Sequence, residues 1–330
     1  CTSMAAMFYE CRALRSITLP TTGPSATISM AQTFYGCQAL DMVTIPSGYS
    51  ATTLSETFRN CYNIENISFS GAQNSCTTLL NMCDNARNLQ TITMPTSLNA
   101  CTTVSAAFIQ CYTLKGPVVW PSTMSVLDSM QQVHYDNYAL QSVTLPTSIR
   151  GNNANCFYQA FIRNQALTSI TLPATITSGS TPTYFGYMFY LSPNLRTITL
   201  PTTQSTGVNY VENFFYNNYS LATINNTDKI GNNSTGSTTY LDATAMFSGA
   251  KQVSGLTFSC KFSKLVCNGT NTTSDQSRLS SLRLSNVGSG QWGGSSPQID
   301  ISYTQMSTSA LNLLFADMAA QPAVVGKTIN

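Results

Sequence analysis

The residue types best suited to metal binding or nucleophilic catalysis are few and poorly grouped in this chain. Eleven cysteines occur without a C-x-x-C pair, and His134 is the only histidine. A zinc site, or a nucleophile activated by histidine, would have to form around that one residue. His134 occupies a position that holds phenylalanine elsewhere, so we interpret it as a packed core residue. The sequence therefore predicts no catalytic residue, no metal site and no cofactor.

Four of the cysteines share one position, three residues before a leucine or isoleucine that recurs through the chain. They are Cys11, Cys37, Cys61 and Cys111, and the same position elsewhere holds Ala86, Asn137, Asn164, Ser192 and Asn218. A position that accepts a thiol, an amide, a hydroxyl or a methyl group is one where a small side chain lies inside a turn and contacts the backbone. We interpret these cysteines as structural.

Cys76 and Cys101 form a separate pair. Each lies thirteen residues before its recurring leucine in adjacent copies of the repeat. Stacked copies would bring their Cα atoms to within about 5 Å, which is disulfide distance. The sequence favours free thiols and leaves a disulfide open.

Acidic residues decide whether the chain could cleave a polysaccharide, because glycosidases need two carboxyl groups about 5 to 10 Å apart. Asp128 and Asp136 flank one copy of the repeat, and Glu56 and Glu65 flank another. Five more are scattered: Asp228, Asp242, Asp275, Asp300 and Asp317. We expect no two acids to share a position in neighbouring copies, so a depolymerase is the less favoured alternative.

The charge content excludes several classes of partner. Lys and Arg number 15 and Asp and Glu 13, so 8% of the 330 residues are charged and the net charge is +2, against about 25% charged in an ordinary domain. Such a surface gives no electrostatic reason to bind nucleic acid or an anionic membrane. No run of 18 apolar residues predicts a transmembrane helix.

These residues belong to a repeat that recurs about every 25 residues. Segments such as LRSITLP, LDMVTIP, LQTITMP and LRTITLP each begin with one leucine, which we call the anchor. Spacings run from 24 to 28, with a last interval of 32. A unit of this length cannot bury its apolar residues alone, so the repeat predicts a stacked solenoid. The anchors are Leu14, Leu40, Ile64, Leu89, Leu114, Leu140, Leu167, Leu195, Leu221 and Val253.

Each copy repeats the same apolar pattern around its anchor. An aromatic lies six residues before it in most copies, with Cys83 and His134 as replacements; the aromatics are Phe8, Phe34, Phe58, Phe108, Phe161, Phe189, Phe215 and Phe247. After the anchor, residues alternate with period two, as in Ile17, Thr18 and Leu19. This alternation predicts one short strand per copy, ended by a proline that cannot donate a hydrogen bond.

The pattern FxxCxxLxxITLP, in Phe8–Pro20 and again in Phe34–Pro46, resembles the BspA-type leucine-rich repeats. The resemblance covers residues 1–253 and implies a strand-lined solenoid of the kind carried by cell-surface and virion proteins. Two copies depart from the pattern: the fifth reads LKGPVVWP, and the copy after Leu221 ends in NNTD without its proline. The Thr-, Ser- and Asn-rich, charge-poor form looks like copies in phage fibres and other virion-surface proteins.

The expected fold is an α/β solenoid of the leucine-rich repeat type, with about ten coils of 24–28 residues and one short parallel strand per coil. Residues 1–253 form the solenoid, 254–298 an irregular strand and loop region in which the register is lost, and 299–330 the start of a further strand and helix. In that last unit Leu311, Leu314, Phe315 and Met318 are expected on one helix face. Because both ends fall inside repeats, we expect a longer protein.

Two sets of side chains are the candidate binding residues. Outward-facing strand positions predict a polar, uncharged ladder, which β-propensity alone also explains: Thr18, Thr44, Thr93, Thr144, Thr171 and Thr199, with Ser68. Tyrosines beside the Phe and Cys positions should be partly exposed, and rigid tyrosines favour recognition surfaces; shielding the turns explains them equally well. The candidates are Tyr9, Tyr35, Tyr62, Tyr112, Tyr138, Tyr190, Tyr216 and Tyr219, and Tyr135 occupies an equivalent position.

Together these features predict a non-enzymatic structural and adhesion protein on a virion surface, as fibre, tail or decoration protein, or otherwise extracellular. Its expected partners are a host surface receptor or glycan and other virion structural proteins, with no nucleic acid and no membrane insertion; a homo-oligomer is left open. A bacterial cell-surface adhesin is the alternative within the same architecture, and a polysaccharide depolymerase the alternative from another class.

Overall fold

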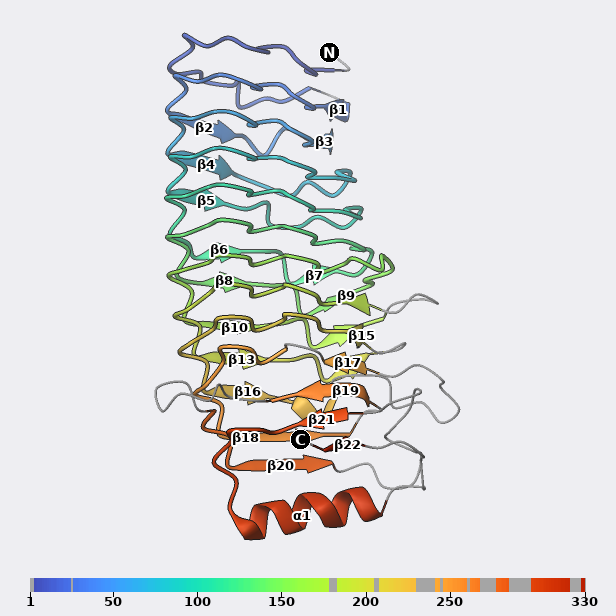
Figure 1. The fold of residues 1–330 in the computed structure, drawn as a ribbon. Helices are drawn as coiled ribbons and strands as arrows, with labels where there is room; N and C mark the ends of the chain where they lie inside the picture. Colours follow the sequence, from blue (N-terminus) through green and yellow to red (C-terminus); the bar gives the residue numbers. More distant parts are fainter. Residues whose placement is uncertain are drawn as a thin grey trace.

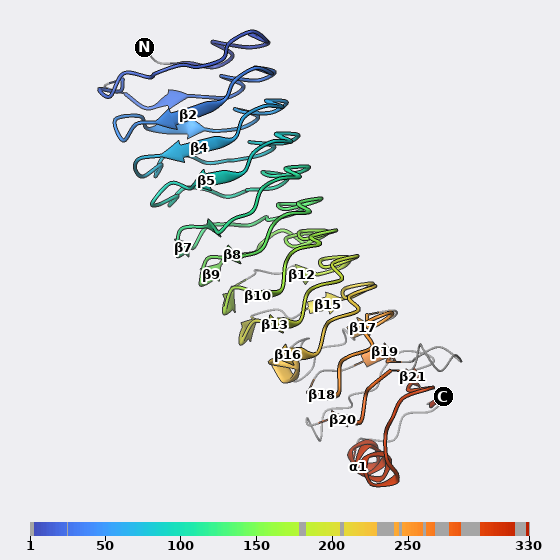
Figure 2. The ribbon, with the colours of Figure 1, turned by 90° about the vertical axis from the view of Figure 1, so that its left-hand side faces the viewer.

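The structure of the protein is a computed structural model that describes residues 3–24, 26–177, 183–204, 208–229, 241–243, 246–259, 262–267, 277–284, 298–320 and 328–329. Figure 1 shows successive turns of chain stacked along one axis, with α1 (Thr308–Ala319) at the end opposite the N-terminus. The view at right angles shows the same stack (Figure 2). The predicted solenoid is therefore confirmed.

The strand that follows each anchor forms the first parallel column. Within residues 1–253 it holds eight strands, slightly fewer than the ten expected coils, because the first coil adds only a bridge between Ser16 and Met42. The tenth coil's strand lies just beyond residue 253. The eight are β2 (Met42–Ile45), β4 (Asn66–Phe69), β5 (Thr91–Thr93), β6 (Val118–Val119), β8 (Val143–Thr144), β10 (Ser169–Thr171), β13 (Thr197–Thr199) and β16 (Thr223–Asn225).

Most coils carry more than one strand, which corrects the expectation of one per coil. Four follow the proline that ends the first strand: β7 (Thr123–Met124), β9 (Ser148–Ile149), β11 (Thr175–Ile176) and β14 (Thr203–Gln204). The others precede the Phe position or continue that side of the stack: β1 (Ile28–Ser29), β3 (Ala51–Thr53), β12 (Thr183–Tyr184), β15 (Val208–Tyr210), β17 (Leu241–Ala243), β19 (Phe262–Val266), β21 (Gln298–Asp300) and β22 (Thr328–Ile329). These additional strands pair in parallel with the equivalent strands of neighbouring coils, so the coils are also joined away from the first column.

The remaining side, here called the turn face, is built from backbone turns in place of helices. In the second coil the N–H groups of Met30, Gln32, Phe34 and Gly36 donate to carbonyls of the third coil at 2.9 to 3.2 Å. The alternate N–H groups close turns within the coil, as when Thr33 donates to Met30. All these donors are thus satisfied locally or by the next coil, which is why the turn face needs no helix.

The core consists of ladders that run from coil to coil. The anchors Leu40 to Leu221 are fully buried, and so are the Phe-position rings from Phe34 to Phe215. Successive rings stack, with centroids 5.4 Å apart for Phe8 and Phe34 and 5.5 Å for Phe34 and Phe58. Each coil therefore covers its neighbour, and this shared burial is the main stabilising term.

The first strand column continues past residue 253. β18 (Gly255–Phe258) starts two residues after Val253, as β2 does after Leu40, and pairs in parallel with β20 (Ser281–Leu284). Leu279 precedes β20 at the anchor position and is buried. The expected loss of register is therefore wrong for these two strands, whereas the domain boundaries at 253 and 298 stay a prediction. A short 3₁₀ helix, η1 (Thr227–Lys229), occupies the coil that lacks its proline.

The helix α1 covers the last strand of the first column. Leu314 and Met318 are buried and Leu311 is partly buried, whereas Phe315 is exposed, which corrects its expected place on the apolar face. Asp317 accepts two hydrogen bonds from the Arg283 guanidinium at 2.6 and 2.7 Å and one from the Leu284 N–H. Among the described residues no helix is long and apolar enough to cross a membrane.

Candidate functional site: the strand face and the turn face

The outward positions of the first column form a row of hydroxyl groups. In β2 Val43 and Ile45 are buried while Thr44 faces out, and the same alternation recurs in later strands. In-register pairing places Thr44 beside Ser68 and Ser68 beside Thr93. The members Thr18, Thr44, Thr93, Thr144 and Thr171 are exposed, and Ser68 and Thr199 are half-buried. The structure thus brings the predicted ladder together on one face.

Six of the eight predicted tyrosines stack in pairs on the turn face. Ring centroids are 4.8 Å apart for Tyr9 and Tyr35, 5.2 Å for Tyr112 and Tyr138, and 4.9 Å for Tyr190 and Tyr216. Only Tyr9 and Tyr219 are strongly exposed, at 47% and 52%, and the rest are half-buried. The Arg87 guanidinium lies 5.2 Å from the Tyr62 ring centroid. A role in binding stays a prediction for all of them.

Three further tyrosines, not singled out from the sequence, contact the last pair and one another through tilted or edge-on rings. Tyr158 lies 5.3 Å from Tyr184 and 6.1 Å from Tyr187, and Tyr187 lies 5.6 Å from Tyr190. Burial, then the nearby Glu212 carboxylate, raises the pKa of Tyr184 to about 12. The equivalent repeat positions hold other residue types in most coils. The cluster of Tyr158, Tyr184 and Tyr187 is therefore visible only in the three-dimensional structure.

The Cys and Asn position forms a ladder of donors to the backbone. The Cys37 thiol donates to the Phe8 carbonyl at 3.1 Å and the Cys61 thiol to the Phe34 carbonyl at 3.0 Å. Later coils use other donors to the same carbonyl position, as when Asn218 donates to Phe189 at 2.7 Å and Ser192 to Phe161 at 3.0 Å. This confirms that the small side chain lies inside the turn and contacts the backbone.

The thiols are kept protonated by their surroundings. Burial raises the pKa of Cys37 and Cys76 to about 11 and that of Cys101 to about 12, and it raises the pKa of Cys61 further. Cys76 and Cys101 are both free. Because the thiolate is the reactive form, none of these four cysteines is activated as a nucleophile.

His134 is a core residue, as its position predicted. It is fully buried, and its ring stacks between Phe108 and Phe161 at 5.2 and 5.6 Å. Asn137 uses its amide N–H on the Phe108 carbonyl, so its oxygen accepts from His134 Nδ1 at 2.9 Å. Burial lowers the pKa of His134 to about 4, although the Asn137 hydrogen bond opposes that shift. A neutral ring enclosed by aromatics is no general base near neutral pH.

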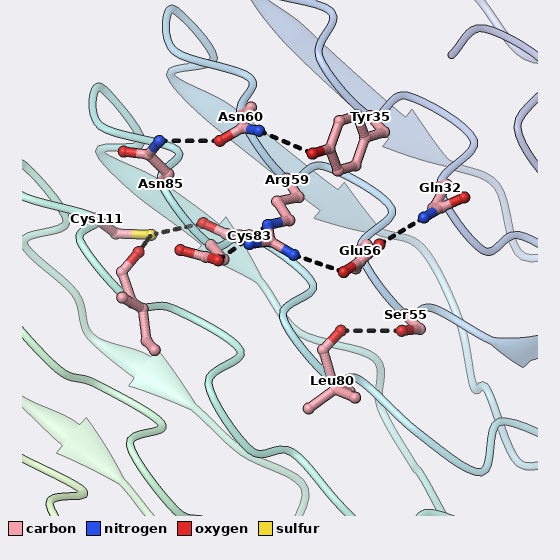
Figure 3. A network of polar contacts seen from close by, with 12 residues as sticks. Gln32, Tyr35, Ser55, Glu56, Arg59, Asn60, Leu80, Cys83, Asn85 and Cys111 are labelled. Atoms are coloured by element: carbon pink, nitrogen blue, oxygen red, sulfur yellow. Dashed lines mark hydrogen bonds and ion pairs between the residues drawn. The ribbon is translucent and has the colours of Figure 1, made fainter. Parts of the chain in front are cut away.

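A polar network crosses three coils of the turn face (Figure 3). Arg59 donates to Glu56 at 2.6 Å and forms an ion pair with Asp84 at 3.0 Å, while the second Glu56 oxygen accepts from Gln32 at 2.6 Å. Burial opposes ionisation of Glu56, but the Gln32 and Arg59 hydrogen bonds lower its pKa overall. Burial raises the pKa of Asp84, with Arg59 opposing. Both Glu56 oxygens are occupied, so the arrangement is structural.

The acids also correct one expectation. Asp41 and Glu65 each directly follow an anchor in neighbouring coils, and the Glu65 N–H donates to the Asp41 carbonyl at 2.8 Å, so two acids do share a position. They line a groove of about 640 Å³ with Arg15 and Asn88. Asn88 donates to Glu65 at 3.2 Å.

In the part of the chain that is described, no three histidine, cysteine or acidic side chains group as a metal site.

The geometry of stacked coils agrees with a comparison against protein families. The model of the BspA type leucine rich repeat region matches in six copies, over residues 4–115, 105–241 and 134–274. This chain belongs to the BspA-type leucine-rich repeat family. The matched range reaches beyond residue 253, as does the first strand column of this BspA-type solenoid.

Solved structures resemble this BspA-type chain at low sequence identity. A leucine-rich repeat protein from Bacteroides ovatus is 14% identical with a TM-score of 0.41, covering 100% of this chain and 87% of its own. A leucine rich cell surface protein from Faecalibacterium prausnitzii is 18% identical with a TM-score of 0.30, covering 67% and 68%. An LRR protein from Leptospira interrogans is 12% identical with a TM-score of 0.32, covering 97% and 72%. No curated protein sequence matches the chain.

Proposed function

We propose that this leucine-rich repeat chain is a non-enzymatic attachment protein exposed on a virion surface, where its strand face contacts a host receptor or glycan. The observation that carries the proposal is the row of exposed hydroxyls, from Thr18 through Thr171, on in-register strands. A repeated surface supports binding through many weak, identical contacts. The tyrosine stacks of the turn face offer a second contact area.

The low charge content supports an uncharged partner surface. Only 8% of residues are charged, and several charged side chains are used internally, as in the Arg59 network and the Arg283–Asp317 pair. Non-enzymatic action is supported by the occupied Glu56, the protonated thiols and the enclosed His134. Incubation with host capsule and measurement of released reducing ends tests the depolymerase alternative.

The attachment proposal is tested by binding of the purified chain to host cells. A triple variant, Thr44→Lys, Thr93→Lys and Thr171→Lys, places three charges on the hydroxyl row without disturbing the core. We expect it to lose at least tenfold in cell binding. The matched control, Ala72→Lys, Asn63→Lys and Asn99→Lys, carries three charges at exposed positions off the row and should bind as the parent does. Equal binding by both variants would overturn the proposal.

The virion location has its own test. Antibodies against the chain, applied to purified particles and to bacterial cells, should label the particles in electron micrographs. Labelling confined to the bacterial envelope would replace the virion role by that of a cell-surface adhesin and leave the adhesive strand face in place.

A further inference from the structure

The first strand column is interrupted twice near its middle. β2, β4 and β5 form one sheet, β6 and β8 a second, and β10, β13 and β16 a third, although the strands at each boundary remain adjacent. The fifth coil explains the first interruption. It carries an extra residue, and Pro117 precedes Val118 as Thr91 precedes Ile92, so it has no N–H to donate to the preceding coil as Thr91 does to the Glu65 carbonyl. Strands that share no ladder are free to separate.

A groove follows each interruption. The first, of about 630 Å³, runs over β5, β6 and β8, and the second, of about 380 Å³, runs over β8 and β10. Thr144, Leu145 and Thr147 line both, so the two meet at β8 and together, here called the groove, extend from β5 to β10. The groove thus lies within the hydroxyl row and is bordered by Thr93 and Thr171.

Solvent reaches the inward side chains of β5 and β8 slightly further than those of the uninterrupted sheet, whereas Val118 and Trp120 in the coil of β6 between them stay buried at 0 and 1% exposure. Ile92, Met94, Val143 and Leu145 are 6 to 8% exposed, whereas Val43, Ile45, Ile67 and Phe69 in the uninterrupted sheet are 0 to 2% exposed. The buried, apolar side chains Ile92, Met94, Val143 and Leu145 form the floor of the groove.

One outward-facing side chain in this groove is apolar, although it lies in the row of hydroxyl groups. β6 pairs with β8 so that Val119 lies beside Thr144, which puts a valine where neighbouring coils carry a hydroxyl. Val119 is 51% exposed, and Pro117 and Pro121 flank it in the groove. The result is an apolar spot between hydroxyl groups, with no charged side chain in the lining of either groove.

We propose that this groove binds a neutral oligosaccharide whose C–H faces rest on Val119 and the prolines and whose hydroxyls bond to Thr93, Thr144 and Thr171. The uncharged lining suits a ligand without sulfate, sialic acid or phosphate. The volumes of its two parts, about 630 and 380 Å³, each fall within the range of about 300 to 1,000 Å³ that is usual for small-ligand sites. The inference rests on the attachment function and assigns it a ligand class and a place.

The test uses the whole chain on an array of neutral, sialylated and sulfated oligosaccharides. Binding is expected among the neutral glycans alone, and Val119→Lys should weaken it at least tenfold by adding a charge and length to the groove. The matched control is Met42→Lys, since Met42 is an apolar side chain, 56% exposed, on β2 of the same column but in neither groove. Its affinity should stay within twofold of the parent.

Three results would overturn the inference: binding to no neutral glycan, binding to charged glycans instead, or equal weakening by Val119→Lys and Met42→Lys. Competition by host peptides in place of glycans would also contradict it. The same two variants in the cell-binding assay separate this inference from the attachment function. If the parent attaches to cells and Val119→Lys attaches equally well, the groove assignment fails and the attachment function stands.

Discussion

Besides the shared apolar core, single polar side chains join the coils by donating hydrogen bonds to the backbone of the preceding coil. The donor position three residues before the anchor illustrates this, because a thiol, an amide or a hydroxyl each reaches the same carbonyl. Asn164 donates to the His134 carbonyl at 2.7 Å and to the Ile162 carbonyl at 3.2 Å, and it is fully buried. The residue type at this position varies from coil to coil, but the hydrogen bond to the carbonyl of the preceding coil recurs.

Replacement of Asn164 by Ala removes the side-chain donor to the buried His134 carbonyl, whereas the Ile162 carbonyl still accepts from the Asp136 N–H. We expect a loss of about 1 to 3 kcal/mol in the free energy of unfolding, measured by urea denaturation. Asn164→Ser should lose less, since Ser192 fills the same position in the next coil and donates at 3.0 Å. Asn63→Ala, at an exposed position, serves as control. A serine variant as unstable as the alanine variant would contradict the donor role.

His134 makes the stability of the solenoid sensitive to acid. Burial lowers its pKa to about 4 from about 6.5 in the unfolded chain. The unfolded state therefore binds the proton first, and the contribution of the neutral ring is complete above pH 6.5 and lost as the pH falls toward 4. Between pH 7 and pH 5 this loss amounts to about 2 kcal/mol, at 1.36 kcal/mol per pKa unit.

The variant His134→Phe tests this, because Phe fills the same position in neighbouring coils. Its unfolding free energy should fall by about 2 kcal/mol less than that of the parent between pH 7 and pH 5. Carboxylates titrate in both proteins, and their effect cancels in the comparison. Parallel pH profiles for the two proteins would show that His134 is not the titrating group.

At the scale of elements, coils and strands contact mainly their neighbours. Within each sheet the strands pair from one coil to the next, and α1 packs against β20. A solenoid built in this way opens locally, because a lost contact weakens one interface and leaves distant coils intact. The end covered by α1 is the place to observe this.

Leu314→Ala should loosen α1 and β20 while leaving β2 and β4 unchanged. Leu314 is fully buried, so its truncation costs about 2 to 5 kcal/mol at that interface, whereas Leu313→Ala alters a side chain that is 49% exposed. Hydrogen exchange resolved by segment measures the effect. Faster exchange throughout the chain would argue for a single cooperative unit.

At the scale of the whole molecule, a surface with a net charge of +2 and few ions should bind by contacts that salt does not screen. We expect half-maximal attachment to host cells to change less than about twofold between 50 and 500 mM salt, because screening acts only on charges. A polylysine-coated bead, whose adhesion is ionic, is the control. A steep fall in attachment by the chain itself would reveal a charged contact that the strand face does not provide.

The sequence alone sufficed for the architecture, because one pattern is repeated many times. Anchors such as Leu40 and rings such as Phe34 recur at fixed spacing, and identical coils can bury them only by stacking. The structural role of Cys61 and the burial of His134 in the core were predicted from the same repeat positions. The burial of a repeated position is predictable, because the residue types in the other copies show whether that position is apolar.

Only the tertiary structure showed the features that depend on contacts between different copies of the repeat. The sequence did not reveal that Arg59 joins Glu56 to Asp84, that β18 and β20 keep the register, or that Phe315 faces solvent. The groove beside Val119 is of the same kind. It lies where one extra residue and one proline in a single coil break the strand ladder to the preceding coil, and the space left there depends on how neighbouring coils pack, which no periodic pattern contains.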